Sequence, residues 1–231
     1  MHFCNRHVRR EPPGINLSFR PVLHTLTLII FAISTISSVR AQISQDEVPA
    51  ELQFLTTGDY DTWTPPEDIA KNYPYYLSGF DDQNRPIWVL EFGKWDIRSG
   101  LLKDEEHEKA LDKHIDQATW NFFNSTGLRA SAEAPIKEFI VLIDADGYNL
   151  QQLNSVKTVS FVARKLALIT IATRFASSVY VVNVNFLAER LLSILKPLLG
   201  KEFEKFLIFG TNTNKYIPRL LRDLPKDQIP E

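Results

Sequence analysis

Residues 178–210 read SVYVVNVNFLAERLLSILKPLLGKEFEKFLIFG, and this stretch decides the fold of the chain. Its pattern predicts a strand over Val179–Asn183, an apolar helix over Phe186–Leu199 and a second strand over Phe206–Gly210. At ~100° per residue, the polar side chains of the helix share one arc: Glu189, Arg190, Ser193 and Lys196. The apolar arc covers roughly half of the circumference, more than the ~100° stripe of a helix packed on one side. We therefore expect this helix either to lie inside the core or to cover an apolar cavity.

Predicted strands and helices alternate along the rest of the chain. In order they are strand Ile87–Phe92, helix Asp104–Phe123, strand Phe139–Ile143, helix Val156–Thr173 and, after the stretch quoted above, helix Lys215–Arg222. Before them, Gly79–Pro86 reads as a turn-rich run. Alternation of this kind predicts parallel strands joined by right-handed helical crossovers. The expected fold class is therefore α/β with a mostly parallel sheet.

The first 41 residues have the composition of a secretory signal peptide. Four arginines precede the apolar run Leu26–Ile33, and small residues then lead to Val39-Arg40-Ala41. The apolar run is shorter than the ~20 residues of a membrane span, so we expect cleavage after Ala41 and a secreted or lumenal protein. An uncleaved segment that anchors the chain in a membrane is the alternative. Residues 42–72 are expected to form a lead-in with short helical turns at Glu51–Leu55 and Glu67–Asn72.

Charge and cysteine content exclude several kinds of partner. The full chain carries 26 basic and 28 acidic residues. Five arginines and one glutamate lie in residues 1–41. The mature chain therefore has 21 basic and 27 acidic residues, a net charge of −6. A net negative charge argues against nucleic acid as the main partner. The single cysteine, Cys4, lies in the segment to be removed, so no thiol, disulfide or cysteine metal site is expected.

Motifs for catalysis are scarce. The strand Phe139–Ile143 runs into Asp144-Ala145-Asp146-Gly147, a motif that haloacid-dehalogenase-type phosphatases use for an aspartate nucleophile and Mg²⁺. A tight turn, in which the aspartate caps and the glycine takes a positive φ, explains the same residues. His107 and His114 lie ~10 Å apart along one helix, too far to bind one metal ion. We expect no metal, no cofactor and no catalytic residue, with the phosphatase as the remote alternative.

Several motifs follow one another in a recognisable order. They are Gly79–Pro86 with Gly93-Lys94-x-Asp96, the turn Asp144–Gly147, the strand that ends at Asn183, Lys196-Pro197-Leu198-Leu199, the strand Lys205–Gly210 and the tail Asp227–Glu231. Together they resemble the CRAL-TRIO lipid-binding domain family over Tyr73–Glu231. In that family a glutamate stands where this chain has Arg174, and that glutamate and the lysine matched by Lys205 are linked to phosphoinositide binding. The headgroup that Lys205 would meet is therefore open.

The resemblance implies a lipid carrier in which the sheet forms the floor of a cavity and the helix over residues 186–199 acts as its gate. It implies a hydrophobic ligand (a retinoid, tocopherol, sterol or phospholipid), transient membrane contact through the gate helix, and a monomer without enzymatic activity. On this interpretation the ligand-binding residues are Ile140, Leu142, Phe161, Val179, Val181, Phe186, Leu187, Leu191, Leu195 and Lys205.

The alternative to a carrier is a non-catalytic protein-interaction module whose cavity is filled by its own side chains. Five phenylalanines are bulky enough and suitably placed to fill it: Phe161, Phe175, Phe186, Phe203 and Phe206. A cavity beneath the gate helix would favour the carrier, and its absence would favour the module.

Overall fold

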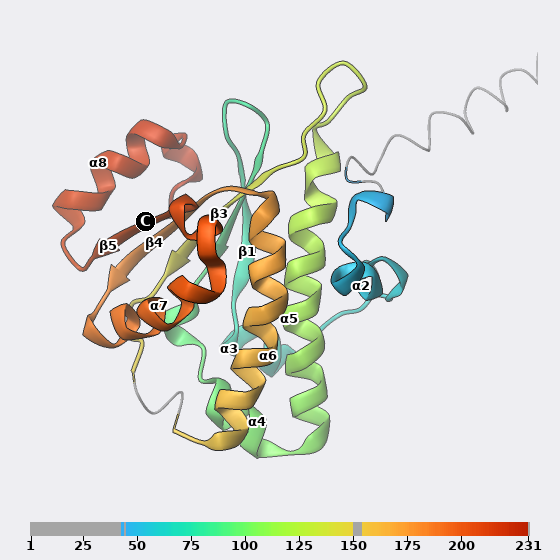
Figure 1. The fold of residues 1–231 in the computed structure, drawn as a ribbon, viewed down its shortest axis with the longest axis vertical. Helices are drawn as coiled ribbons and strands as arrows, with labels where there is room; N and C mark the ends of the chain where they lie inside the picture. Colours follow the sequence, from blue (N-terminus) through green and yellow to red (C-terminus); the bar gives the residue numbers. More distant parts are fainter. Residues whose placement is uncertain (1–42, 44, 150–153, 231) are drawn as a thin grey trace, which may run out of the picture. The chain divides into compact units, whose positions relative to one another are not determined.

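Five strands form one sheet in the order β1-β2-β3-β4-β5 (Figure 1). The structure, a computed structural model, describes residues 43, 45–149 and 154–230. The strands are β1 (Tyr75–Phe80), β2 (Pro86–Leu90), β3 (Phe139–Asp144), β4 (Ala176–Val184) and β5 (Phe206–Gly210). β2 to β5 run parallel, and β1 pairs with β2 in the antiparallel direction. The prediction of an α/β fold with a mostly parallel sheet is confirmed. The expected signal peptide, residues 1–41, lies outside the described residues.

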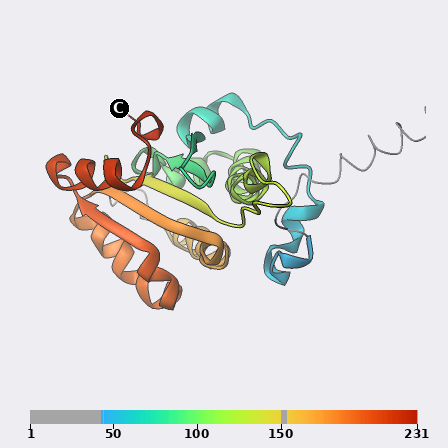
Figure 2. The ribbon, with the colours of Figure 1, turned by 90° about the horizontal axis from the view of Figure 1, so that it is seen from above.

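The helices cover both faces of the sheet (Figure 1). They are α2 (Gln53–Thr57), α3 (Glu67–Asn72), α4 (Ile97–Lys103), α5 (Glu105–Ser125), α6 (Val156–Ala172), α7 (Phe186–Leu199) and α8 (Thr213–Asp223). α5, α6 and α7 each lie between two strands that are neighbours in the sheet. Because every crossover moves the chain in the same direction and such crossovers are right-handed, these three helices share one face. Figure 2 shows α8 on the other side of the strands from α6 and α7.

Side chains alternate between the two faces of each strand, since the side-chain period of a strand is two. Val141, Val179 and Val181 belong to the hydrophobic cluster that also holds residues of α5 and α7. Their neighbours along the strands pack on the other face against Tyr216 and Leu220 of α8: Ile140, Leu142, Tyr180 and Val182. The sheet is thus buried on both faces, as expected for parallel strands with helices on each side.

Two elements were not predicted. β1 falls in and before the run that reads as turns, because Gly79 interrupts its pattern and its register with β2 shifts between Leu77 and Gly79. α4 is only seven residues long and contains Gly100, which weakens the helical signal. The bounds of α7 and β5 agree with the prediction from the quoted stretch.

The lead-in packs onto the sheet-bearing part of the chain. The predicted helical turns are present as α3 and, two residues later than expected, α2. Leu52 and Leu55 are buried in the same cluster as Val179, and Ile69 is buried beside α5. The segment therefore contributes to the hydrophobic core.

The last described turn lies against the first strand. A 3-10 turn over Lys226–Gln228 follows α8, and Ser78 Oγ in β1 donates a hydrogen bond to the backbone oxygen of Gln228 at 2.7 Å. Gly79 lies beside this contact, and a Cβ there would meet the end of the flexible Gln228 side chain, which would have to move. The contact joins segments 150 residues apart.

Candidate functional site

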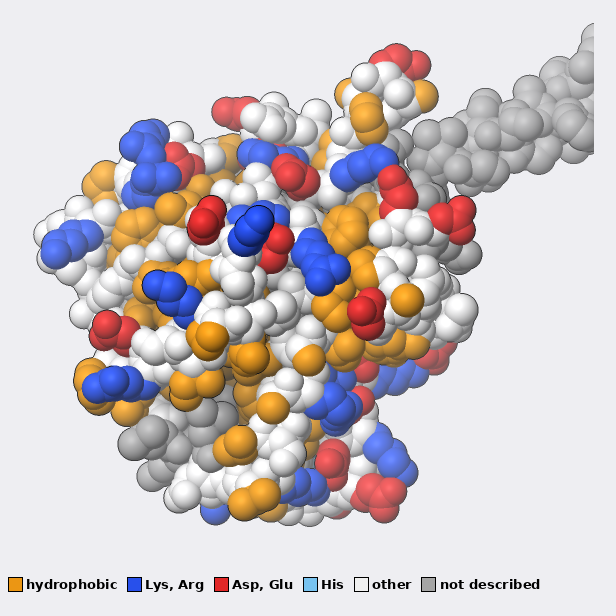
Figure 3. Space-filling model, viewed as in Figure 1, with side chains coloured by type: hydrophobic (Ala, Val, Ile, Leu, Met, Phe, Trp, Pro, Cys, Tyr) orange, Lys and Arg blue, Asp and Glu red, His pale blue; other side chains and the backbone are white. Residues whose placement is uncertain are grey.

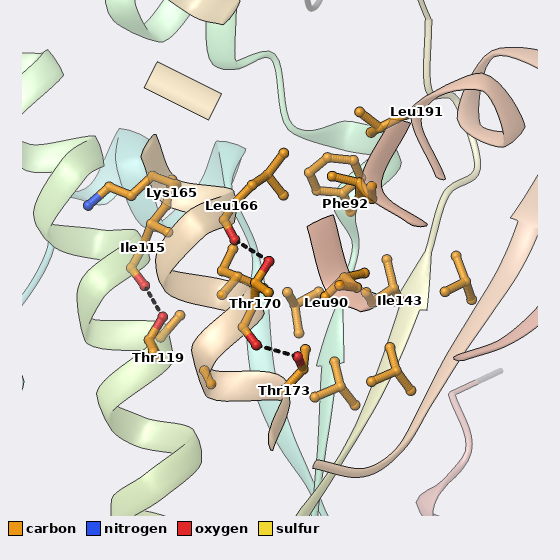
Figure 4. Close-up of a pocket in the computed structure, with 18 of the residues that line it drawn as sticks. Leu90, Phe92, Ile115, Thr119, Ile143, Lys165, Leu166, Thr170, Thr173 and Leu191 are labelled. Atoms are coloured by element: carbon orange, nitrogen blue, oxygen red, sulfur yellow. Dashed lines mark hydrogen bonds between the residues drawn. The ribbon is translucent and has the colours of Figure 1, made fainter. Parts of the chain in front are cut away.

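An apolar pocket of about 180 Å³ lies between the sheet and the helices of the α7 face. Its floor comes from the strands and includes Val141, Val179 and Val181. α5 and α6 form its sides through residues such as Ile115, Phe161 and Leu166, as Figure 4 shows for the labelled members. The pocket therefore occupies the place between layers where the two-residue period of the strands points apolar side chains toward the crossover helices.

α7 covers the pocket with one face and leaves a second apolar stripe outside. Ala188, Leu191, Leu192, Leu195 and Leu199 line the pocket. On the outer side, Phe186, Ile194 and Leu198 are each more than 60% exposed. Figure 3 shows hydrophobic side chains interspersed with lysines and arginines on the face that carries α6 and α7. The wide apolar arc in the sequence thus reflects contact with the pocket on one side and exposure to solvent on the other.

Hydrogen bonds define both ends of α7. Asn185 caps its first turn, since its Oδ1 accepts from the backbone N–H groups of Leu187 and Ala188 at 3.0 Å. Gly200 follows the last residue with a φ of +54°, a conformation that glycine adopts without steric cost.

Three threonines are among the residues that line the pocket. Thr119 on α5 donates to Ile115 O at 3.1 Å, and Thr170 on α6 donates to Leu166 O at 2.8 Å. Thr173, just after α6, donates to Thr170 O at 2.7 Å. Each hydroxyl therefore satisfies its hydrogen within its own backbone segment, and each oxygen keeps lone pairs that can accept.

Lys165 contributes only its aliphatic stem to the pocket. Its ammonium points toward α5 (Figure 4), where it donates to Asp116 Oδ1 at 2.7 Å and to Asp112 O at 3.0 Å. Asp112 Oδ1 lies 3.0 Å from the same nitrogen and 2.8 Å from Arg164. Burial raises the pKa of Asp116, an effect that the charge of Lys165 opposes. The cluster is an ion-pair network between two helices beside an apolar space.

The structure brings five of the ten predicted ligand-binding residues together around the pocket: Phe161, Val179, Val181, Leu191 and Leu195. Ile140 and Leu142 lie on the opposite face of β3, against α8. An apolar strand buried on both faces gives no sequence signal for which alternate residues face a cavity. From β3, the pocket is lined instead by Phe139, Val141 and Ile143.

The remaining predicted residues also lie away from the pocket. Phe186 is exposed beneath the guanidinium of Arg190, whose central carbon is 4.9 Å from the ring centre. Leu187 packs with the cluster of Ala145 and Tyr148. At ~100° per residue, Phe186 lies ~160° around the helix from Ala188 and points away from the pocket. Leu187 lies only ~40° from Leu191, so it shares that side of the helix but contacts Ala145 and Tyr148 instead of lining the pocket.

Lys205 is bound to its own surroundings. It donates to the backbone oxygens of Thr173 at 3.1 Å and Arg174 at 2.9 Å, and Glu202 Oε2 lies 2.8 Å away. Glu202 therefore provides the negative charge that the sequence lacks at Arg174. The lysine closes the junction between α6 and β4 and does not line the pocket.

The turn Asp144–Gly147 has the geometry of a capped strand end. Asp144 Oδ1 accepts from the backbone N–H of Asp146 and from Nδ2 of Asn183, each at 2.9 Å. Gly147 has a φ of +83°. These features agree with the tight-turn interpretation. Within residues 43, 45–149 and 154–230, no three His, Cys, Asp or Glu side chains are grouped to hold a metal ion.

Sequence reasoning missed Lys165 and the three threonines. A lysine in an amphipathic helix normally reads as a solvated charge, and a threonine as a neutral surface residue. The available signal was that Lys165 adjoins Leu166, a residue on the predicted buried face of its helix. In the described part of the chain, every helix is too short or too polar to cross a membrane.

Comparison with known proteins agrees with this architecture. Residues 70–231 match a family model described as CRAL/TRIO domain. Among solved structures, "Crystal structure of Sfh5" is similar with a TM-score of 0.50 at 14% identity, over 84% of this chain and 68% of that chain. At that identity the structural likeness shows the fold alone.

Proposed function

Because this chain belongs to the CRAL/TRIO domain family, we propose that it is a non-catalytic carrier that binds a hydrophobic small molecule in the pocket beneath α7 and transfers it between membranes. The family match suggests lipid binding. The observation that carries the proposal is the pocket itself, whose lining is almost entirely apolar and whose cover is a single helix.

The energetics favour such a ligand. Burying apolar surface contributes ~25 cal/mol per Å², so a ligand that buries roughly 400 Å² gains about 10 kcal/mol before ordering costs. The pocket, at about 180 Å³, is smaller than the roughly 300–1,000 Å³ typical of ligand sites. A long lipid therefore requires α7 to move outward, and the junctions at Asn185 and Gly200 are the places where it would turn.

We propose that the outer stripe of α7 makes the transient membrane contact. Phe186, Ile194 and Leu198 would enter the interface, and Arg190 and Lys196 beside them would meet lipid phosphates. Opening of α7 at the membrane would then connect the pocket with the lipid phase, which is what transfer requires.

Two adjacent valines provide a matched test of the binding site. Val181 and Val182 are both buried in β4, but Val181 lines the pocket and Val182 packs on the α8 face. Val181→Phe and Val182→Phe overpack the two sides of one strand, each at about 1–3 kcal/mol of stability. We expect mass spectrometry of organic extracts to find lipid with the wild type and Val182→Phe and to find much less with Val181→Phe. Equal lipid content in the two folded variants would contradict the assignment of the site.

The phenylalanines weigh against the filled-cavity module. Phe161 and Phe206 line the pocket, but Phe203 stacks on Phe206, Phe175 packs on Phe123, and Phe186 is exposed. The pocket of about 180 Å³ that remains beside these side chains supports the carrier. A folded protein that never takes up any lipid would instead support the module.

We also propose that the chain enters the secretory pathway and loses residues 1–41. The support is the sequence pattern alone: arginines, an apolar run and small residues before Gln42. N-terminal sequencing of secreted protein should begin at Gln42. Retention in membranes with His2 and Phe3 intact would indicate an anchor.

A further inference from the structure

We propose that the protein has a second binding site, on the face of the sheet opposite α7, and that this site takes a small organic cation with an ammonium group on an apolar body. The site is a pocket of about 660 Å³ between the sheet, α8 and the tail that follows α8. It shares no lining residue with the pocket beneath α7. The inference is therefore independent of the proposed carrier function.

The second pocket lies toward the carboxyl ends of the parallel strands. Its floor is apolar and comes from Val89 in β2, Leu142 in β3 and Val182 in β4. α8 contributes one wall, which includes Ile217 and Leu220. In open α/β sheets, the crevice outside the carboxyl ends of the strands is the usual place for a ligand. The floor and this wall offer contacts to an apolar body.

Four neighbouring strands each bring one polar side chain to this pocket. They are Tyr76 in β1, Glu91 directly after β2, Asp144 at the end of β3 and Asn183 near the end of β4. Neighbouring strands lie ~4.8 Å apart, so the four side chains form a row beside the apolar floor. A ligand with one polar end and one apolar end matches this division.

A bulge in β4 turns Asn183 into the pocket. Val182 and Asn183 are adjacent in sequence and both line the pocket, although side chains in a regular strand alternate between the two faces. Asn183 has a φ of +57°, and the register of β4 with β5 shifts between Val181 and Val184. Asparagine adopts this left-handed conformation more readily than most residues. Bulges of this kind re-aim a side chain and are common beside functional sites.

Asn183 holds one oxygen of the half-buried Asp144 and leaves the other for a ligand. Its Nδ2 donates to Asp144 Oδ1 at 2.9 Å, and its Oδ1 accepts from the Tyr216 hydroxyl at 3.0 Å. The backbone N–H of Asp146 donates to the same Asp144 Oδ1. Asp144 Oδ2 receives no hydrogen bond from the residues that the structure describes. A carboxylate oxygen only accepts, so the ligand must supply a donor.

The charges at the pocket leave one negative charge in excess. Lys94 also lines the pocket and forms an ion pair with Glu91. The pKa of Lys94 is raised by its hydrogen bond to Glu91, by the charge of Glu91 and, to a smaller extent, by the charge of Asp144. One positive charge thus lies near two negative charges. A primary ammonium group would balance the excess and bring three hydrogens to donate, whereas an anion would be repelled.

Three probes with similar apolar bodies separate the possibilities: phenethylamine, phenethyl alcohol and phenylpropanoate. Calorimetric titration of the full-length protein at pH about 7 keeps the amine protonated and the acid ionised. The amine should bind about 10-fold more tightly than the alcohol, and phenylpropanoate should bind most weakly. Equal binding of the amine and the alcohol, tightest binding of phenylpropanoate, or no binding of the amine would overturn the inference.

Replacement of Asp144 tests its role in the site. Asp144→Asn removes the charge but keeps an oxygen that can accept from Asp146 and Asn183, so the turn remains capped. It should weaken phenethylamine about 10-fold and leave phenethyl alcohol unchanged. Asp82→Asn is the control, because it removes one exposed negative charge in the hairpin at the other end of β2 and should change neither affinity. Equal affinities for the amine in the two folded variants would refute the assignment.

The valine pair in β4 separates this site from the pocket beneath α7. Val182→Phe places a ring in the second pocket and should abolish binding of phenethylamine, with the lipid content unchanged. Val181→Phe should lower the lipid content and leave binding of the amine intact. The reverse result for the amine would place it beneath α7 and refute the second site, without consequence for the carrier function. If Val182→Phe does not fold, Asp144→Asn decides.

Discussion

Removing the outer apolar stripe of α7 should detach the protein from neutral membranes. The change is Phe186→Ser, Ile194→Ser and Leu198→Ser together, at side chains that are 63%, 64% and 61% exposed. Fully burying such a side chain contributes about 1.5–3 kcal/mol, so burying the exposed part of each contributes about 1–2 kcal/mol. For a shallow interface we take the lower value, about 3 kcal/mol for the three, which corresponds to a ~100-fold loss of vesicle affinity.

Flotation with neutral phosphatidylcholine vesicles measures this affinity without a contribution from lipid charge. The control changes three exposed leucines elsewhere on the protein to serine: Leu102 (52% exposed), Leu128 (65%) and Leu221 (45%). Both variants should remain folded by circular dichroism, because they alter solvent-exposed side chains. Equal losses in the two variants would refute a specific role of α7, and so would full binding of the α7 variant.

Three further predictions concern stability. Lys165→Met should lower the free energy of unfolding, measured in urea, by about 3–5 kcal/mol, because it leaves Asp116 buried without its partner. Adding Asp116→Leu should recover part of this loss. An unchanged unfolding midpoint in Lys165→Met would show that the pair is not buried in solution. Gly93→Ala should lower the free energy of unfolding by about 1–3 kcal/mol, because its Cβ would lie 1.8 Å from Asp146 O. Gly210→Ala is the control: its Cβ would meet the nearest atom at 3.8 Å, so the stability should change little. Similar losses in the two variants would contradict the close approach of Gly93 to Asp146. Burial lowers the pKa of His114, whose Nε2–H donates to Tyr73 O at 2.9 Å and whose Nδ1 is buried without a partner among the described residues. Just below pH 6.5, therefore, only the unfolded chain takes up a proton at this residue, and the free energy of unfolding should fall as the pH falls through that range. His114→Gln should flatten this pH dependence in denaturation curves.

Local patterns predicted those parts of the fold that depend on local sequence. α7 and β5 have the expected bounds because a capping Asn185, a run of leucines and Gly200 mark the helix within its own sequence. β1 was missed because its pairing with β2 defines it, and its own residues, interrupted by Gly79, read as a turn.

The candidate site was predictable only in part, because a strand buried on both faces carries no sign of which side is which. Ile140 and Val141 are equally apolar neighbours, and only the position of α8 decides that Ile140 faces away from the pocket. Lys165 was missed for a related reason. Its partner Asp116 is 49 residues away on another helix, and no local pattern reports that contact.

The contact between Ser78 and Gln228 has a consequence for how the chain folds during synthesis. Since β2 to β5 add to the sheet in sequence order, each new strand can pair as soon as its crossover helix has formed. The 3-10 turn that contacts β1, however, arrives only after residue 228 has been made. Until then the tail does not lie against β1, an edge strand of the sheet, and an edge strand without cover is a hazard for aggregation. A nascent chain stalled within α8 would therefore be most exposed at the opposite end of its sequence, on the first strand of the sheet.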